Sequence, residues 1–239
     1  TLIVCFYILP TFAYTVDITT LGAKGDGITD NTAFIQKAID DCSARKGGTV
    51  EIPSGHFLTR TLFLKSNVNL HLHFGAELLG STDLDSYHKV FPELKGKESP
   101  ALIFARGVAN IAITGSGTIN GQGAHQNFQH GNDSKGGPRR PKIIYFIGCN
   151  NVRVQDVTLR NSAYWTQDYE KCNGVIVRGV KVYSHANWNN DGLDIDSRNV
   201  VVSDCYIDCD DDALCLKSDT DTPCENVTVT NCVLKSNCN

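Results

Sequence analysis

Two short acidic motifs late in the chain carry the side chains best suited to acid–base chemistry. Asp191 lies in the motif NNDGL, and Asp211 and Asp212 lie in DDDAL. When the motifs are aligned with Leu193 opposite Leu214, Asp191 and Asp212 take equivalent positions and Asp211 lies beside them. Carboxylates held close together repel one another, which raises the pKa of at least one of them. One carboxylic acid with one or two carboxylates is the machinery of glycoside hydrolysis.

The same residues permit two other interpretations. Stacked Asp and Asn side chains could supply oxygen ligands to Ca²⁺. Asp and Asn are also common in tight turns, and Asp208, Asp219 and Asp221 are expected to be turn residues. On the pattern alone, catalysis, calcium binding and turn formation all remain open.

A sequence repeat indicates how these motifs are positioned. Four short runs of valine and other β-branched residues recur, with their first valines at Val152, Val175, Val200 and Val227. Each run is followed by a second apolar pair, and no segment of helical period separates the runs. Repeats of this length predict an all-β right-handed parallel β-helix, in which successive coils stack. A leucine-rich repeat is less suitable, because it requires a regular leucine framework that this chain lacks.

Cysteines follow the same repeat. Cys149, Cys172 and Cys224 each lie three residues before a repeat valine, and Ser197 takes the corresponding position before Val200. Equivalent residues of successive coils stack about 4.8 Å apart. We therefore expect stacked free thiols rather than a disulfide network.

The first part of the chain differs from the repeats. Residues 31–42 show helical periodicity, and Asp30 is the expected N-cap. Since a solenoid exposes its core at each end, this helix is predicted to cap the N-terminal end. Residues 14–239 are predicted to form one β-helix domain, with a long loop at 121–141.

Residues 1–13 predict the apolar part of a secretory signal peptide, and hence a secreted or periplasmic protein. The segment is too short to span a membrane, and Pro10 interrupts it. The net charge of −4 argues against nucleic acid as a partner, because nucleic-acid binding requires a basic surface.

The motifs NNDGL and DDDAL resemble the first two signature motifs of glycoside hydrolase family 28, the polygalacturonase family. Further similarities lie at Gly22-Ala-Lys-Gly-Asp-Gly, Gly48-Thr-Val-Glu-Ile-Pro-Ser-Gly, Gly117-Thr-Ile-Asn-Gly-Gln-Gly, Arg140-Pro and Asn161-Ser-Ala-Tyr-Trp-Thr. The resemblance implies a parallel β-helix that hydrolyses pectin-like polysaccharide with inversion, as a monomer without metal or cofactor. It also implies that Asp211 is the general acid and that Asp191 and Asp212 activate water.

The resemblance fails near the end of the chain. The third family motif, Gly-His-Gly, corresponds to Asn237-Cys-Asn, so Cys238 stands where the family has histidine. The fourth motif, Arg-x-Lys, does not occur before Asn239. We therefore expect that the C-terminal coils of the solenoid are missing from this sequence.

Five further residues are candidates for substrate binding. A 25-residue step places Trp165 and Thr166 level with Asn190 and Asp191, so Trp165 could stack on a sugar. Arg140 and Lys217 could bind a sugar carboxylate, although a solvated basic loop also explains Arg140. Asn189 and His185 lie near Asp191 in the sequence.

One residue conflicts with the proposed register. Glu170 falls level with Ile195 and Leu216, which should point into the core. Either the register shifts at this position or the Glu170 carboxylate is paired.

Two competing functions are consistent with the same solenoid. One is a pectate lyase, which would need Ca²⁺ and an arginine base. The other is a non-catalytic carbohydrate-binding β-helix, to which the substitution at Cys238 gives some support.

Overall fold

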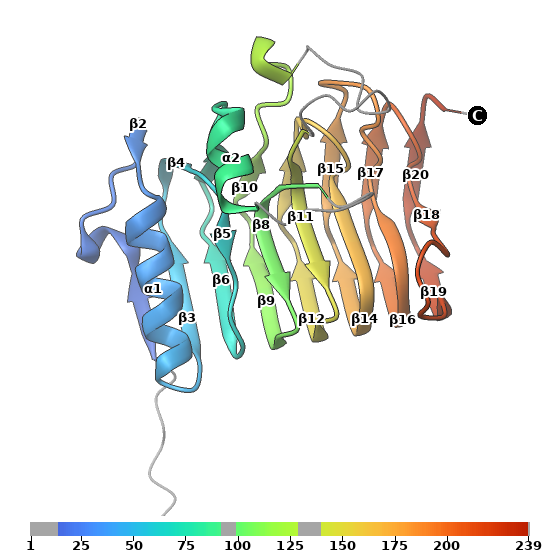
Figure 1. The fold of residues 1–239 in the computed structure, drawn as a ribbon, viewed down its shortest axis with the longest axis horizontal. Coiled ribbons are helices and arrows are strands. Elements are labelled where there is room, and N and C mark those ends of the chain that lie inside the picture. Colours follow the sequence, from blue (N-terminus) through green and yellow to red (C-terminus); the bar gives the residue numbers. More distant parts are fainter. Residues whose placement is uncertain (1–13, 92–98, 129–139, 239) are drawn as a thin grey trace, which may run out of the picture.

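The computed structural model describes residues 14–91, 99–128 and 140–238. Its strands form a 12-stranded sheet and an 8-stranded sheet that wind along one axis as a right-handed parallel β-helix (Figure 1). The all-β fold class predicted from the repeats is confirmed. The predicted signal segment, residues 1–13, lies outside the described residues.

Three strips of parallel strands make up the solenoid. The first contains β1 (Thr15–Asp17), β3 (Gly48–Ile52), β6 (Val68–Leu72), β9 (Ala109–Gly115), β12 (Asn150–Gln155), β14 (Gln167–Arg178), β16 (Asp194–Ser203) and β19 (Glu225–Thr230). The second contains β5 (Leu62–Phe63), β8 (Ala101–Arg106), β11 (Lys142–Ile147) and β18 (Cys215–Leu216). The long strands β14 and β16 bend across both strips and join them into one sheet.

The third strip forms the separate sheet. It contains β2 (Asp26–Asp30), β4 (Gly55–Thr59), β7 (Ala76–Gly80), β10 (Thr118–Asn120), β13 (Thr158–Arg160), β15 (Lys181–Ser184), β17 (Tyr206–Cys209) and β20 (Val233–Ser236). The helices are α1 (Thr32–Ala44) and α2 (Leu84–Val90), with 3₁₀ turns at Ile18–Leu21 and Gln126–Phe128. None of the helices in the described segments is both long and apolar enough to cross a bilayer.

The repeat valines pair as the sequence predicts. Val152 lies opposite Val175, Val175 opposite Val200, and Val200 opposite Val227. The first three are fully buried, because alternate residues of each strand point into the solenoid. Each cysteine among the described residues is a free thiol, which confirms the expectation of stacked thiols for that part of the chain.

Asparagines recur at equivalent positions within these strands, directly before the inward-pointing residues of the repeat. Asn110, Asn151, Asn199 and Asn226 all have positive φ, a conformation that asparagine tolerates better than most residues. The Asn151 amide donates to Asn110 Oδ1 at 2.8 Å, and the Asn226 amide donates to Asn199 Oδ1 at 3.1 Å. An amide can donate to one neighbour and accept from the other. On the coil of β14 the equivalent position is Gly174, and there the Asn199 amide donates to Asn173 Oδ1 at 2.7 Å instead.

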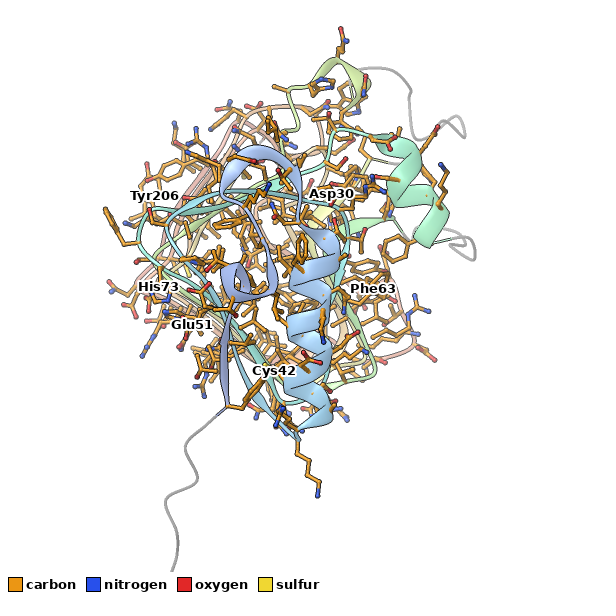
Figure 2. The ribbon with its side chains drawn as sticks, turned by 90° about the vertical axis from the view of Figure 1, so that its left-hand side faces the viewer. Asp30, Cys42, Glu51, Phe63, His73 and Tyr206 are labelled. Atoms are coloured by element: carbon orange, nitrogen blue, oxygen red, sulfur yellow. The ribbon has the colours of Figure 1, made fainter. Side chains whose placement is uncertain are left out.

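Helix α1 covers the N-terminal end of the solenoid, as predicted (Figure 2). Its inward face buries Ile35, Ala38, Ile39 and Cys42. The N-cap is Asn31 rather than Asp30, so that prediction is wrong by one residue. The Asn31 side chain turns inward and donates to the carbonyls of Lys24 and Thr29, while Asp30 accepts from the Thr32 amide at 3.0 Å.

The last coil is much more exposed than the coil before it. Leu234 is 45% exposed, whereas its partner Ile207 is 1% exposed. Val229 is 41% exposed, whereas its partner Val202 is completely buried. The expectation that further coils follow stays a prediction.

Candidate active site

The two acidic motifs lie on neighbouring coils in the predicted register. The Gly192 amide donates to the Asp212 carbonyl at 2.8 Å, and Ile195 pairs with Leu216. Asp191 and Asp212 therefore occupy equivalent positions. A Cβ at Gly192 would lie 2.3 Å from Ile207 Cγ2 and 2.7 Å from the Ala213 carbonyl oxygen. Only glycine allows the two acidic turns to pack this closely.

Asp191 is the most buried of the three carboxylates. It is 4% exposed, whereas Asp211 and Asp212 are half-buried. Burial raises the pKa of Asp191 to about 6, against the opposing effect of the Lys217 ammonium and with further increases from Asp211 and Asp212. The crowding of carboxylates expected from the sequence is therefore present. It raises the pKa of Asp191, the residue to which the family resemblance assigns water activation.

Asp194 is a buried carboxylate that the sequence interpretation did not select. It is completely buried, and neither of its oxygens accepts a well-oriented hydrogen bond from a described residue. Lys217 Nζ lies 3.0 Å from its Oδ1 and 3.5 Å from Asp191 Oδ2. Burial and the Asp191 charge raise the pKa of Asp194 well above its usual value, and Lys217 opposes them. The only signal in the sequence was a charged residue between Leu193 and Ile195, two inward-pointing positions.

A buried arginine holds the loop that carries Asn189. Arg140 is 1% exposed and donates to the Trp188 carbonyl at 2.7 Å, the Ala163 carbonyl at 2.9 Å and Asn189 Oδ1 at 3.2 Å. The Asn189 amide then donates to Asp211 Oδ2 at 3.4 Å. The interpretation of Arg140 as part of a solvated loop is therefore wrong, because its guanidinium orients Asn189 and, through it, Asp211.

Two lysines lie over the ring of Trp165 at the edge of a cavity. Lys142 Nζ lies 4.4 Å and Lys217 Nζ 4.5 Å from the centre of its ring, which is favourable for cation–π contact. Lys142 is itself buried against Asp168, with 2.5 Å between Nζ and Oδ2. The cavity measures about 440 Å³, and Trp165, Lys217, Glu170 and Lys171 form part of its lining.

The 25-residue step that placed Trp165 is wrong by one residue. The Thr166 amide donates to the Asp191 carbonyl at 2.7 Å, and Asp168 pairs with Asp194, a step of 26 residues. A register shift between Glu170 and Asn173 accounts for the difference. Trp165 rather than Thr166 is thus level with Asp191.

Both explanations offered for Glu170 hold. The register shift places it opposite Asp196 rather than Ile195, and its carboxylate accepts a hydrogen bond from the Tyr145 hydroxyl at 2.6 Å. The expectation that Leu216 points into a covered core is wrong, because this side of the last coil is open and Leu216 is 56% exposed.

Comparison with known proteins identifies the family of this chain. Residues 42–236 match the model for "Glycosyl hydrolases family 28". The chain belongs to this family.

Relatives of this family 28 chain include plant and bacterial proteins. A probable polygalacturonase of Vitis vinifera is 31% identical over 87% of the chain and 45% of its own length. An exo-poly-alpha-D-galacturonosidase of Dickeya chrysanthemi is 30% identical over 83% of the chain and 41% of its own length. The chain thus spans less than half the length of these relatives. The solved structure of a Yersinia enterocolitica family 28 exopolygalacturonase has a TM-score of 0.77 and 29% identity, over 92% of this chain and 48% of that one.

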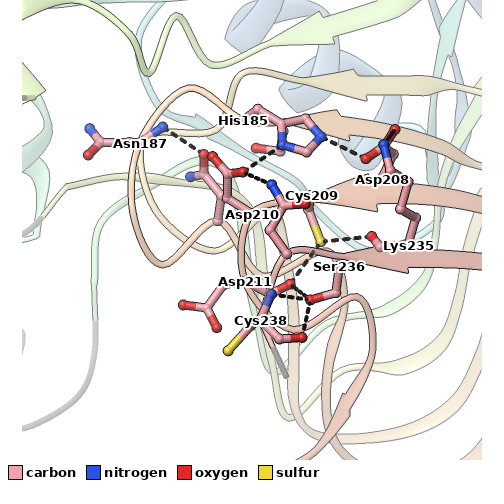
Figure 3. Close-up of polar contacts among 12 residues, drawn as sticks. His185, Asn187, Asp208, Cys209, Asp210, Asp211, Lys235, Ser236 and Cys238 are labelled. Carbon is pink, nitrogen blue, oxygen red and sulfur yellow. Dashed lines mark hydrogen bonds and ion pairs between the residues drawn. The ribbon is translucent and has the colours of Figure 1, made fainter.

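His185 lies apart from the Asn189–Asp211 contact in this family 28 chain. Its Nδ1 is 2.7 Å from Asp210 Oδ1 and its Nε2 is 2.7 Å from Asp208 Oδ1, so both ring nitrogens have acidic partners (Figure 3). These contacts raise the pKa of His185, mainly through Asp210. Asp208 lies within β17, so the expectation that it is a turn residue is wrong.

Asp219 and Asp221 lie outside regular strands, as expected of turn residues. The buried Asp196 carboxylate accepts from the amides of Asp219 and Thr220, at 3.2 and 3.0 Å. Asp196 therefore fixes the loop that borders the cavity.

Cys238 lies beside the acidic pair. Its Sγ and one oxygen each of Asp211 and Asp212 lie within 4.8 Å of one another. Figure 3 shows Cys238 next to Asp211. Ser236 Oγ links the two segments, since it donates to the Asp211 carbonyl at 2.7 Å and accepts from the Cys238 amide at 2.9 Å. The position at which the family has histidine therefore does reach the carboxylates. A thiol is a poor ligand for Ca²⁺, which prefers oxygen, so this group favours the calcium interpretation less than the sequence motifs alone did.

Proposed function

We propose that this family 28 chain contains the acid–base centre of a hydrolase that cleaves glycosidic bonds in pectin-like, galacturonic-acid-rich polysaccharide with inversion. Asp211 protonates the departing glycosidic oxygen, and Asp191 and Asp212 activate the attacking water. The observation that carries the proposal is the stacking of the NNDGL and DDDAL turns, which brings an acid and two candidate bases together. The galacturonan-cleaving relatives support the substrate class.

The assignment of roles agrees with the surroundings of each carboxylate. Asp211 is half-buried and accepts a hydrogen bond from Asn189, so it can reach a bound sugar without losing its orientation. Asp191 is buried beside Lys217, whose positive charge favours its ionised, basic form. Asp191, with its pKa of about 6, is therefore a base at neutral pH and loses this ability in acid.

The neighbouring side chains fit an acidic sugar. Trp165 is half-buried and lines the cavity, where its ring can pack against a sugar face. Asn189 lies 3.4 Å from an oxygen of Asp211 and Lys217 lies 3.5 Å from an oxygen of Asp191, and these two side chains are the proposed substrate contacts. Arg140 donates a hydrogen bond to Asn189, and His185 is paired with two aspartates. The structure therefore gives less support to direct substrate contact by Arg140 or His185.

Removal of the general acid tests the proposal. In the protein as its gene encodes it, Asp211→Asn is expected to lower turnover of polygalacturonic acid at least about a hundredfold, the scale of general-acid catalysis. The matched control is Asp210→Asn, which changes the adjacent carboxylate that binds His185. Reducing-end release reports the rate, and unchanged circular dichroism excludes misfolding. Turnover of Asp211→Asn at the wild-type level would falsify the assignment.

The same assay separates hydrolysis from the alternatives. A hydrolase of this type keeps its activity in chelator and gives no ultraviolet absorbance from an unsaturated product. Calcium-dependent release with such absorbance would indicate the lyase instead. Binding without cleavage would indicate the carbohydrate-binding β-helix, although the family match favours neither alternative.

Location and assembly complete the proposal. Pectin-like polysaccharide lies outside the cell, which agrees with the secreted or periplasmic location predicted from residues 1–13. The monomeric state stays a prediction, and size-exclusion chromatography of the complete protein would test it.

A further inference from the structure

Two histidines and a glutamate lie together on the outer face of the N-terminal coils. One ring nitrogen of His71, one of His73 and one carboxylate oxygen of Glu51 lie within 4.8 Å of one another. Glu51 on β3 is opposite His71 on β6, and both are outward-pointing, half-buried residues of their strands. His73 follows two positions after His71, so it points to the same face. Glu51 and His73 appear side by side at the edge of the solenoid in Figure 2.

Hydrogen bonding fixes the tautomer of His71. The Thr114 hydroxyl donates its single proton to Asn69 Oδ1 at 2.9 Å. The same hydroxyl lies 2.8 Å from His71 Nδ1, and with its proton assigned to Asn69 it accepts from Nδ1–H of His71. In the neutral ring, Nε2 is then left with a free lone pair. A ligating histidine in a metal site is oriented in the same way, by a hydrogen bond from its other ring nitrogen.

His73 and Glu51 supply two further donors. His73 Nε2 is in direct contact with Glu51 Oε2, and a hydrogen bond between a ring nitrogen and a carboxylate oxygen requires one proton between them. A cation that takes the place of this proton would be bound by both groups. The His73 side chain is 50% exposed and that of Glu51 is 21% exposed, so both can move and solvent can deliver an ion.

We propose that Glu51, His71 and His73 form a binding site for a divalent late transition metal, with Zn²⁺ as the representative ion. Two imidazoles and one carboxylate are a typical donor set for Zn²⁺, whereas Ca²⁺ and Mg²⁺ prefer oxygen ligands alone. Zn²⁺ binds imidazole nitrogen at about 2.1 Å, so tetrahedral ligands lie roughly 3.4 Å apart. The three donor atoms already lie within 4.8 Å of one another, and the half-exposed His73 side chain has room to adjust to this spacing, with water as a further ligand.

The site would connect successive coils close to the end that α1 covers. Glu51 belongs to β3, His71 belongs to β6, and the Thr114 hydroxyl that orients His71 belongs to β9. A bound ion therefore joins the first coils of the solenoid and stabilises the folded chain by mass action. Asp191, Asp211 and Asp212 lie in the segments next to β16, β17 and β18, which are several coils further along the axis (Figure 1). The proposal thus stands independently of the proposed hydrolase.

Zinc titration of untagged protein tests the proposal. A second group of donor atoms, on Asp211, Asp212 and Cys238, could also take up Zn²⁺, so the titration is made in the Cys238→Ser background. Calorimetry at pH 7.5 should show one saturable Zn²⁺ per chain, and Zn²⁺ should raise the melting temperature. Affinity should fall steeply at pH 5.5, because protons compete for the imidazoles.

Variants assign the ligands. His71→Ala, His73→Ala and Glu51→Gln should each weaken Zn²⁺ binding at least about tenfold, and Thr114→Val should weaken it by roughly the same factor, as loss of an orienting partner does. The matched control is His56→Ala, because His56 forms a similar pair with Glu77 at 2.7 Å but lacks a second histidine. Glu51→Gln preserves side-chain volume if an alanine variant fails to fold. Wild-type affinity in the ligand variants, equal loss in His56→Ala, or no saturable binding would each overturn the proposal.

Discussion

Lys217 Nζ lies 3.0 Å from Oδ1 of Asp194, a carboxylate with no solvent exposure. Burial disfavours the charged form of Lys217, but the two aspartates beside it outweigh this effect and raise its pKa above the usual value. The lysine therefore stays protonated and supplies positive charge to Asp191 as well, at 3.5 Å. One side chain thus contacts a buried carboxyl group and lowers the pKa of a proposed catalytic group.

Replacement of Lys217 should change the pH dependence of activity. The ammonium lowers the pKa of Asp191, which burial otherwise raises, so Lys217→Gln should raise that pKa above about 6. Because Asp191 acts as a base, the acidic limb of the kcat/KM profile should move to higher pH. Lys235→Gln, which changes an exposed lysine paired with Asp208, should leave the limb in place. An unmoved limb in Lys217→Gln would show that Asp191 does not control it.

Replacement of Arg140 by lysine should affect both stability and turnover. Lysine keeps the charge but cannot reach the carbonyls of Ala163 and Trp188 together with Asn189. Unsatisfied buried carbonyls should lower the free energy of unfolding by about 1–3 kcal/mol, measured by urea denaturation. Turnover should also fall, because Asn189 no longer orients Asp211. Arg153→Lys, on the exposed face of β12, should change the stability by less than about 0.5 kcal/mol.

Addition of a methyl group at Gly192 should separate the two acidic turns. The new Cβ would clash with Ile207 and with the carbonyl of Ala213, and backbone cannot rotate away as a side chain can. We expect Gly192→Ala to lower the free energy of unfolding by about 1–3 kcal/mol. Turnover in the protein that remains folded should fall further than its folded fraction does. A fall in activity that matches the folded fraction alone would argue against a catalytic role for the spacing of Asp191 and Asp212.

The contribution of His185 to stability should depend on pH. Asp210 and Asp208 raise its folded pKa above the unfolded value of about 6.5, so its stabilising effect is complete below that value. The effect is lost as the pH rises through the folded pKa. The side chain is 39% exposed, so the effect should be at most about 1 kcal/mol. The melting temperatures of wild type and His185→Asn should differ more at pH 5.5 than at pH 9. Turnover of the same variant separately tests the predicted role of His185 in substrate binding.

The solenoid and the alignment of its carboxylates could be predicted because they depend on local patterns. Each run of valines predicts a strand, and the pairing of Val175 with Val200 follows from the repeat. The stacked asparagines could also have been predicted, since Asn151, Asn199 and Asn226 directly precede repeat valines. The register near Trp165 could not, because a single extra residue between Glu170 and Asn173 has no clear signature in the sequence.

The environment of the carboxylates depends on contacts between distant residues. Arg140 is 49 residues away from Asn189 in the sequence, and nothing near Arg140 indicates that it is buried. Lys217 and Asp194 are likewise brought together by the stacking of β16 and β18. Such pairs become visible only when the coils are assembled in three dimensions.

The backbone hydrogen bond from Gly192 to Asp212 has a consequence for how such a protein can diversify. Because this bond joins neighbouring coils, the separation of Asp191 and Asp212 along the solenoid axis equals the spacing between coils. It does not depend on the length of any loop. Turns elsewhere on the solenoid can therefore lengthen or shorten, and so reshape the surface around the proposed site, while Asp191 and Asp212 keep their spacing.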